Sequence, residues 1–174
     1  ETAKSQWEGI RKTSKGFADP AHPFMHQGDG KAYTFKMFLE VAHACLKEDG
    51  RIGMIVPSGI YTDKGCTALR ELFMGKCRWE WLFGFENKKG IFSIHRSFKF
   101  CPVVIEKGGT TEAIHAAFMR HNLKNWESPE QFAIDYERGR VLKFSPFSKA
   151  LLEIRTRRDL ELTEKLYDGK VLLG

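Results

Sequence analysis

The residues best suited to chemistry lie in the stretch Glu86–Phe100, where a polar loop separates two runs rich in aromatic residues. Phe92 is a lone aromatic residue inside this loop. Four of its neighbours carry or can carry a positive charge: Lys88, Lys89, His95 and Arg96. An aromatic ring can stack on a nucleobase while nearby cations hold phosphate, which predicts a nucleic-acid contact. The alternative is that Phe92 only covers the end of a strand.

Two strands are expected on either side of this loop. Residues 78–85 alternate, and the expected buried face is aromatic. That face would hold Trp79, Trp81, Phe83 and Phe85. Residues 97–106 are the expected antiparallel partner. Pro102 cannot donate a ladder hydrogen bond, so we expect an edge position or a β-bulge there.

The elements before the loop indicate an α/β fold. Residues 31–48 have helical periodicity with Phe38 on the apolar face and Lys36 and Glu40 on the polar face. After Arg51, residues 52–56 are apolar on both alternating faces, so the segment 51–56 is typical of a strand buried on both faces of a parallel sheet. Ligands bind beyond the carboxyl end of such a strand. A second helix is expected over residues 63–74.

The remaining third of the chain is less regular. Residues 112–119 fit a strand or a helix equally well, and a short strand is expected at 141–144. A charged helix is expected at 157–167. Three arginines lie just before or at its start, where they either form a solvated face or contact phosphate. They are Arg155, Arg157 and Arg158.

Composition sets broad limits on function. The 174 residues include 42% hydrophobic and 29% charged residues, which are globular values, and the net charge of +6 permits a polyanionic partner. No apolar run is long enough to span a membrane and no signal peptide is present, so we expect a soluble, cytoplasmic protein. The four cysteines have no spacing typical of zinc sites or disulfides, and no metal is expected.

The two ends of the chain suggest that it is a piece of a longer protein. It begins at Glu1 without an initiator methionine and ends in the apolar segment Val171–Gly174. Three parts are expected: a loop over residues 1–30, an α/β part over 31–110, and a linker with a helical extension over 111–174.

Over residues 28–174 the sequence resembles the second half of the catalytic domain of large adenine-N6 DNA methyltransferases, of the type IIG-like restriction–modification and phage-defence family. The resemblance rests on the order and spacing of several stretches. They are Lys31–Glu40, Gly50–Ser58, Leu69–Phe73, Phe85–Phe92, His95–Phe100 and Phe144–Glu153. It implies a partial Rossmann-like sheet, with a buried parallel strand and a terminal antiparallel aromatic hairpin, followed by a helical C-terminal extension.

The resemblance also implies an activity. Such enzymes transfer a methyl group from S-adenosylmethionine to an adenine flipped out of double-stranded DNA. By position, Phe92 would stack on the adenine, Lys88, Lys89, His95 and Arg96 would contact DNA, and Phe38, or Phe35 instead, would lie near the cofactor. The glycine-rich cofactor loop and the Asn/Asp-Pro-Pro-aromatic motif of that family are not among these 174 residues, so this chain alone is expected to be inactive. The alternative is a non-catalytic DNA-binding or scaffold module; the oligomeric state is left open.

Overall fold

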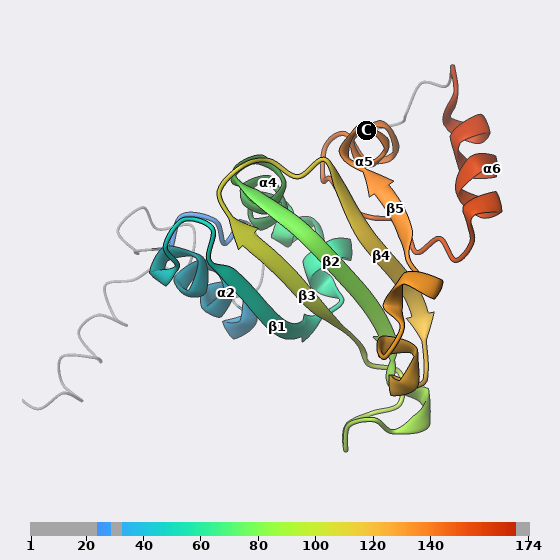
Figure 1. The fold of residues 1–174 in the computed structure, drawn as a ribbon, viewed down its shortest axis with the longest axis horizontal. Coiled ribbons are helices and arrows are strands. Elements are labelled where there is room, and N and C mark those ends of the chain that lie inside the picture. Colours follow the sequence, from blue (N-terminus) through green and yellow to red (C-terminus); the bar gives the residue numbers. More distant parts are fainter. Residues whose placement is uncertain (1–23, 29–32, 170–174) are drawn as a thin grey trace, which may run out of the picture.

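The protein contains one five-stranded mixed sheet with the strand order β1-β3-β2-β4-β5 (Figure 1). The computed structural model describes residues 24–28 and 33–169. Strand β4 runs parallel to β2, whereas the other neighbouring pairs are antiparallel. The strands are β1 (Arg51–Pro57), β2 (Cys77–Glu86), β3 (Lys99–Lys107), β4 (Ala113–Arg120) and β5 (Ile134–Glu137).

This topology brings three strand ends together. Since β3 is antiparallel to both β1 and β2, the strands β1, β2 and β4 all point the same way. Their last residues, Pro57, Glu86 and Arg120, therefore lie along one end of the sheet, which we call the carboxyl edge. Ligands of open α/β sheets bind at such an edge.

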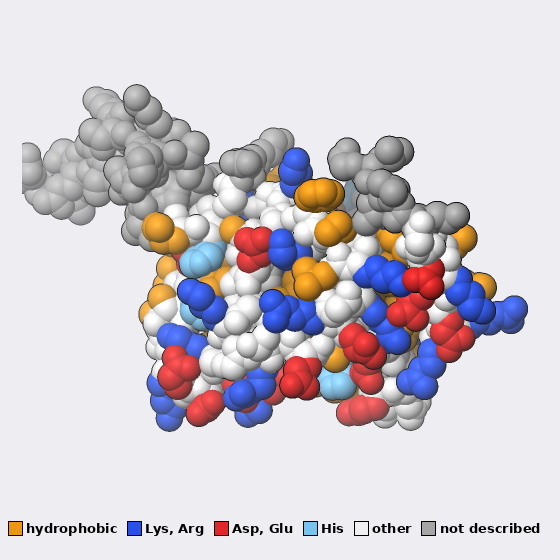
Figure 2. Space-filling model, turned by 90° about the horizontal axis from the view of Figure 1, so that it is seen from above, with side chains coloured by type: hydrophobic (Ala, Val, Ile, Leu, Met, Phe, Trp, Pro, Cys, Tyr) orange, Lys and Arg blue, Asp and Glu red, His pale blue; other side chains and the backbone are white. Residues whose placement is uncertain are grey.

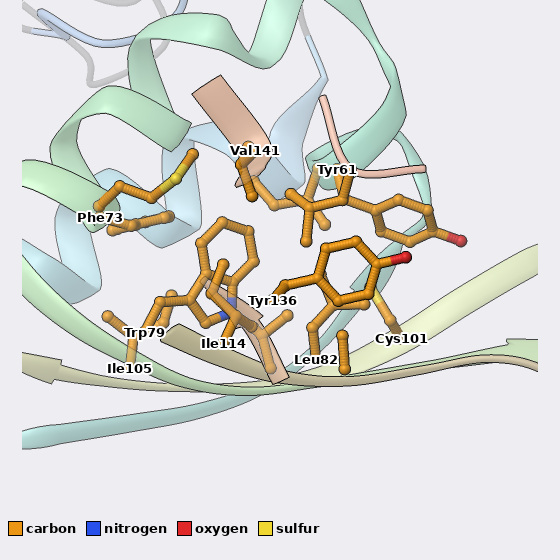
Figure 3. Close-up of a cluster of buried hydrophobic side chains, with 14 of the residues drawn as sticks. Tyr61, Phe73, Trp79, Leu82, Cys101, Ile105, Ile114, Tyr136 and Val141 are labelled. Atoms are coloured by element: carbon orange, nitrogen blue, oxygen red, sulfur yellow. The ribbon is translucent and has the colours of Figure 1, made fainter. Parts of the chain in front are cut away.

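Helices cover one face of the sheet and enclose the main core (Figure 3). Trp79, Leu82 and Ile105 from the sheet are buried there against Phe73 and Val141. The helices are α2 (Thr34–Cys45), α3 (Gly59–Thr62), α4 (Thr67–Lys76), α5 (Arg138–Phe144) and α6 (Arg157–Tyr167), with short 3-10 turns at Lys64–Cys66, Asn87–Lys89, Leu123–Trp126 and Pro129–Gln131. The predicted α/β fold is confirmed, as is the antiparallel pairing of the two aromatic strands.

The predicted aromatic face of β2 is wrong in one respect. The pairing of β2 with β3 shifts register between Trp79 and Trp81. Such a bulge turns the following side chains to the other face. Trp79 therefore lies in the main core with Leu82, whereas Phe83 and Phe85 form a second, smaller core on the opposite face.

Pro102 lies neither at an edge nor in a bulge, contrary to expectation. Its strand, β3, is internal, and the pairing with β1 continues unbroken past Pro102. On the side of β2, Leu82 pairs with Val103 and Phe85 pairs with Phe100, but the positions between these two pairs are not paired. The ladder is thus interrupted where proline has no N–H to donate.

Strand β1 is not buried on both faces as predicted. Only one side of it carries packed side chains, with Ile52 and Val56 buried but Ile55 exposed. The reason is that β1 pairs only with β3 among the described strands, and only one of its faces is covered by helix α2 and the main core.

The structure resolves the remaining expectations for helices and strands. The ambiguous segment 112–119 is strand β4, and the segment 141–144, predicted as a strand, lies in helix α5 because its Val141 and Phe144 pack inward at helical spacing. The helix expected at 63–74 is instead a short turn followed by α4. Helix 157–167 is confirmed.

No helix within residues 24–28 and 33–169 is long and apolar enough to cross a membrane.

Candidate nucleic-acid interface at the carboxyl edge

A single buried side chain fixes the loop between β2 and β3. We call this segment, residues 87–98, the aromatic loop; it lies beyond the ends of β2 and β4 (light green in Figure 1). Asn87 is completely buried at its base. The Asn87 Nδ2 donates to the carbonyl oxygens of Phe92 and Ile94, each at 3.0 Å, and Oδ1 accepts from the Phe92 N–H at 2.9 Å. Asn87 therefore holds both the N–H and the carbonyl group of Phe92.

The ring of Phe92 is partly packed and partly free. It meets Phe100 edge to face, with centroids 4.8 Å apart, and 40% of the residue remains exposed. The two interpretations of this residue are thus compatible. One part of the ring covers the start of β3, while the rest is available for stacking.

The four basic residues predicted around Phe92 lie in the same loop but differ in their surroundings. Lys88 pairs with Glu86 at 2.8 Å, and Arg96 Nη1 donates to the Lys88 carbonyl at 2.7 Å. His95 Nδ1 lies 2.7 Å from Ser97 Oγ. For the Lys89 side chain, the described part of the chain offers no hydrogen bond or ion pair. Lys89 is thus the most available of the four for phosphate.

Gly90 allows Arg96 to fold back over the loop. Its φ of +69° is a conformation that suits glycine, and a Cβ there would lie 3.3 Å from Arg96 Cζ. The loop is consequently compact, with its guanidinium lying against its own backbone.

Glu86 joins the base of the loop to the rest of the carboxyl edge. It is buried and accepts from both Lys88 and His121. Burial opposes its ionisation, but these hydrogen bonds and charges prevail and lower the pKa of Glu86 below its usual value. Lys99 bonds Glu153 at 2.6 Å, and Glu153 also accepts from the buried Tyr61 hydroxyl at 2.7 Å. The C-terminal segment is therefore tied to the first residue of β3.

A groove of about 550 Å³ opens at the carboxyl end of β1. Aromatic side chains line it together with a carboxylate and an ammonium group, a set suited to a flat heterocycle with polar substituents. The lining residues are Tyr33, Phe35, Pro57, Ser58, Gly59, Asp63, Ser97, Phe98 and Lys99. A Cβ on Gly59 would lie 2.5 Å from the Asp63 carboxylate, so a larger residue there would force this carboxylate to shift. Ligand binding at this edge stays a prediction.

The structure separates the two aromatics considered for the cofactor. Phe35 lines the groove, whereas Phe38 is 64% exposed and lies outside it. The predicted apolar face of α2 is wrong because its buried side includes Lys36 and Glu40. Lys36 Nζ donates to the Gln27 carbonyl at 2.6 Å, and Glu40 accepts from the Gln27 side chain at 2.6 Å. These charges are buried because they form hydrogen bonds with the segment 24–28. Helical periodicity alone does not reveal such a contact.

Comparisons with known proteins agree with this architecture. The family described as Eco57I restriction-modification methylase matches residues 11–92, just under half of the chain. The structure is similar to that of the type IIG restriction endonuclease BpuSI, with a TM-score of 0.55 and 17% identity over 71% of this chain. It is also similar to a modification subunit of a putative type I restriction enzyme from Vibrio vulnificus YJ016, with a TM-score of 0.53 and 18% identity over 74% of this chain. A search of curated proteins gave no match.

The predicted resemblance to restriction–modification methyltransferase domains is thereby confirmed. At these identities the two structures show a shared fold. The matched region is 16% of BpuSI and 33% of the Vibrio subunit, so this chain spans a small part of each.

Proposed function

We propose that this chain is part of a DNA adenine-N6 methyltransferase of a restriction–modification or phage-defence system, with S-adenosylmethionine as the methyl donor. The observation that carries the proposal is the presentation of Phe92. It is a half-exposed aromatic held at a strand end by a buried asparagine, in a chain that resembles methyltransferases of such systems.

The proposed role of Phe92 is to stack on the target base. The amine of an adenine in duplex DNA is inaccessible, so the base must leave the helix and be held outside it. A partly exposed ring on a fixed backbone can hold it without a large entropic cost. Lys89 is the nearest free cation for the adjoining phosphates, with Lys88, His95 and Arg96 contributing to the positive charge of the loop.

The groove fits part of the cofactor. S-adenosylmethionine supplies an electrophilic methyl group on sulfur. In the groove, the ring of Phe35 would contact its adenine, and the Asp63 carboxylate would accept hydrogen bonds from hydroxyl groups. Phe38 remains a weaker candidate because of its position outside the groove.

The test compares two exposed apolar residues of the same loop. In the full-length protein that carries this chain, methyl transfer from labelled S-adenosylmethionine to saturating duplex DNA is measured for Phe92→Ala and Ile94→Ala. Stacking is worth about 1–3 kcal/mol, so Phe92→Ala should lower the rate by about 5- to 150-fold. Ile94→Ala, which removes a half-exposed side chain without a ring, should change it little.

An unchanged rate for Phe92→Ala would refute the stacking role. DNA binding without any methyl transfer by the unaltered protein would favour the second candidate, a non-catalytic DNA-binding or scaffold module. The feature that discriminates the two candidates is the catalytic tetrapeptide of the resembled family, because an intact one in the full-length protein favours the enzyme.

A further inference from the structure

A bulge at the end of β4 redirects an arginine. The pairing of β4 with β2 passes from Phe83–Ala117 to Phe85–Arg120, so β4 has one more residue than β2 over this interval. Met119 takes up the extra length with a φ of +59°, which is uncommon for a residue with a side chain. Bulges of this kind re-aim side chains. Here the bulge places Arg120 on the face of the second core.

Arg120 is well positioned but poorly satisfied. Its guanidinium carbon lies 4.7 Å from the centroid of the Phe132 ring, a cation–π contact. Its Nε is shielded from solvent and has no hydrogen-bond partner in the described chain. Nor does any carboxylate of the described residues pair with it. Shielded polar groups nearly always have partners, so this arrangement calls for one.

Arg155 brings a second positive charge to this edge, because Glu153, two residues before it, bonds Lys99 at the start of β3. Lys99 also approaches Glu86, which accepts from His121, the residue after Arg120. Burial lowers the pKa of Arg120, and the charge of the exposed Arg155 lowers it further. For Arg155, too, the described segments contain no carboxylate partner. Two guanidinium groups that repel each other without an intervening acid form an arrangement that an anion would stabilise.

Arg120 is linked to the aromatic loop through the second core. Phe132, under Arg120, packs on the second core, and so does Ile91 from the loop. The same core contains Phe100, on which Phe92 rests. A strand of DNA whose base reached Phe92 would therefore have its backbone within range of this pair.

We propose that Arg120 and Arg155 form a binding site for a backbone phosphate of DNA, beside the base held by Phe92. The choice of DNA as the polyanion rests on the proposed function. Arg120 supplies one guanidinium group, which is oriented by Phe132 and the bulge. Arg155 supplies a second guanidinium group from the C-terminal segment.

The test is the salt dependence of binding to labelled duplex DNA, measured with the full-length protein. Each phosphate contact contributes about 0.9 to the slope of log affinity against log salt. Arg120→Gln with Arg155→Gln removes both contacts to that one phosphate and should reduce the slope by about 0.9. Arg155→Gln alone removes an exposed side chain and should reduce the slope by part of that amount. The matched control is Arg138→Gln. Arg138 is also exposed but lies next to the opposite end of β4, and its loss should leave the slope near the unaltered value.

Equal slopes for Arg155→Gln and Arg138→Gln would overturn the proposal, even if methyl transfer still depended on Phe92. Conversely, the slope could be lowered only by the Arg120 and Arg155 variants while the protein transfers no methyl group. That result would support the phosphate site and refute the enzymatic function. Because the Arg155 side chain is exposed, its variant reports on binding even if the Arg120 variant folds poorly.

Discussion

At the end of the sheet opposite the carboxyl edge, several positive charges have partners within the protein. Arg51 pairs with Glu80 at 3.0 Å, and Arg51 and Arg78 share the buried carboxylate of Glu106. Lys107 donates to the Leu46 carbonyl at 2.7 Å and so caps the end of α2. At the carboxyl edge, by contrast, Lys89, Arg120 and Arg155 have no such partner among residues 24–28 and 33–169. The two ends of one sheet thus use the same residue types for different purposes.

The comparison shows why net charge alone does not locate a binding site. On the face shown in Figure 2, basic and acidic side chains are interspersed. The excess of six positive charges in the sequence says nothing of which cations are already neutralised. The unpaired cations next to Phe92 are therefore more informative than the total charge.

The largest expected effect follows from removing the anchor of the aromatic loop. Asn87→Ala leaves two partly buried backbone groups, the Phe92 N–H and the Ile94 carbonyl, without the side-chain partner they have in the structure, at about 1–3 kcal/mol per group. The free energy of unfolding measured by urea denaturation should fall by about 2–4 kcal/mol, and methyl transfer should fall with it because Phe92 is released. Asn125→Ala is the control, since no side-chain hydrogen bond is formed by this residue in the described chain. Equal stability of the two variants would contradict the anchoring role.

An intermediate, pH-dependent effect is expected at Glu86. Its folded-state pKa is depressed below its usual value near 4.5, so its contribution is fully present above that pH and disappears as the pH falls through the lower, folded-state pKa. Glu86→Gln should therefore cost about 1–2 kcal/mol at pH 7. The difference in the free energy of unfolding between the variant and the unaltered protein should become smaller when denaturation is measured below pH 4.5. A gap that is constant with pH would show that the ionised carboxylate is not the stabilising form.

The smallest effect is expected at the opposite end of the sheet. Arg51 is a solvent-exposed partner of Glu80 and Glu106, and exposed ion pairs contribute little to stability. Arg51→Gln should leave both the urea midpoint and the salt dependence of DNA binding essentially unchanged. A lowered salt slope would place DNA at this end as well and remove the contrast between the two ends.

Much of the fold could be predicted from the sequence because local patterns specify it. Helix 157–167 and the antiparallel aromatic pair follow from periodicity, and the place of Phe92 between the strands follows from the polar residues around it. The bulge near Trp79 could not be predicted in this way, because a register shift depends on the partner strand. It moved Trp79 away from Phe83 and split one expected aromatic face into two.

The candidate site was predicted less completely than the fold. The loop residues were identified, but Asn87 was missed, although an asparagine directly after a strand is a signal for side-chain bonds to the backbone. Arg120 and the buried pair Lys36 and Glu40 were missed for another reason. Their surroundings are assembled from segments distant in the sequence, such as Phe132 and Gln27.

The most direct test of the central claim is hydrogen exchange of the full-length protein with and without duplex DNA, read by mass spectrometry. If the carboxyl edge binds DNA, amides of the aromatic loop, 87–98, and of the segment after β4, 120–124, should exchange more slowly in the complex. Amides at the opposite end, such as 108–112, should be unaffected. Protection at 108–112 without protection in the loop would contradict the assignment of the carboxyl edge as the nucleic-acid interface.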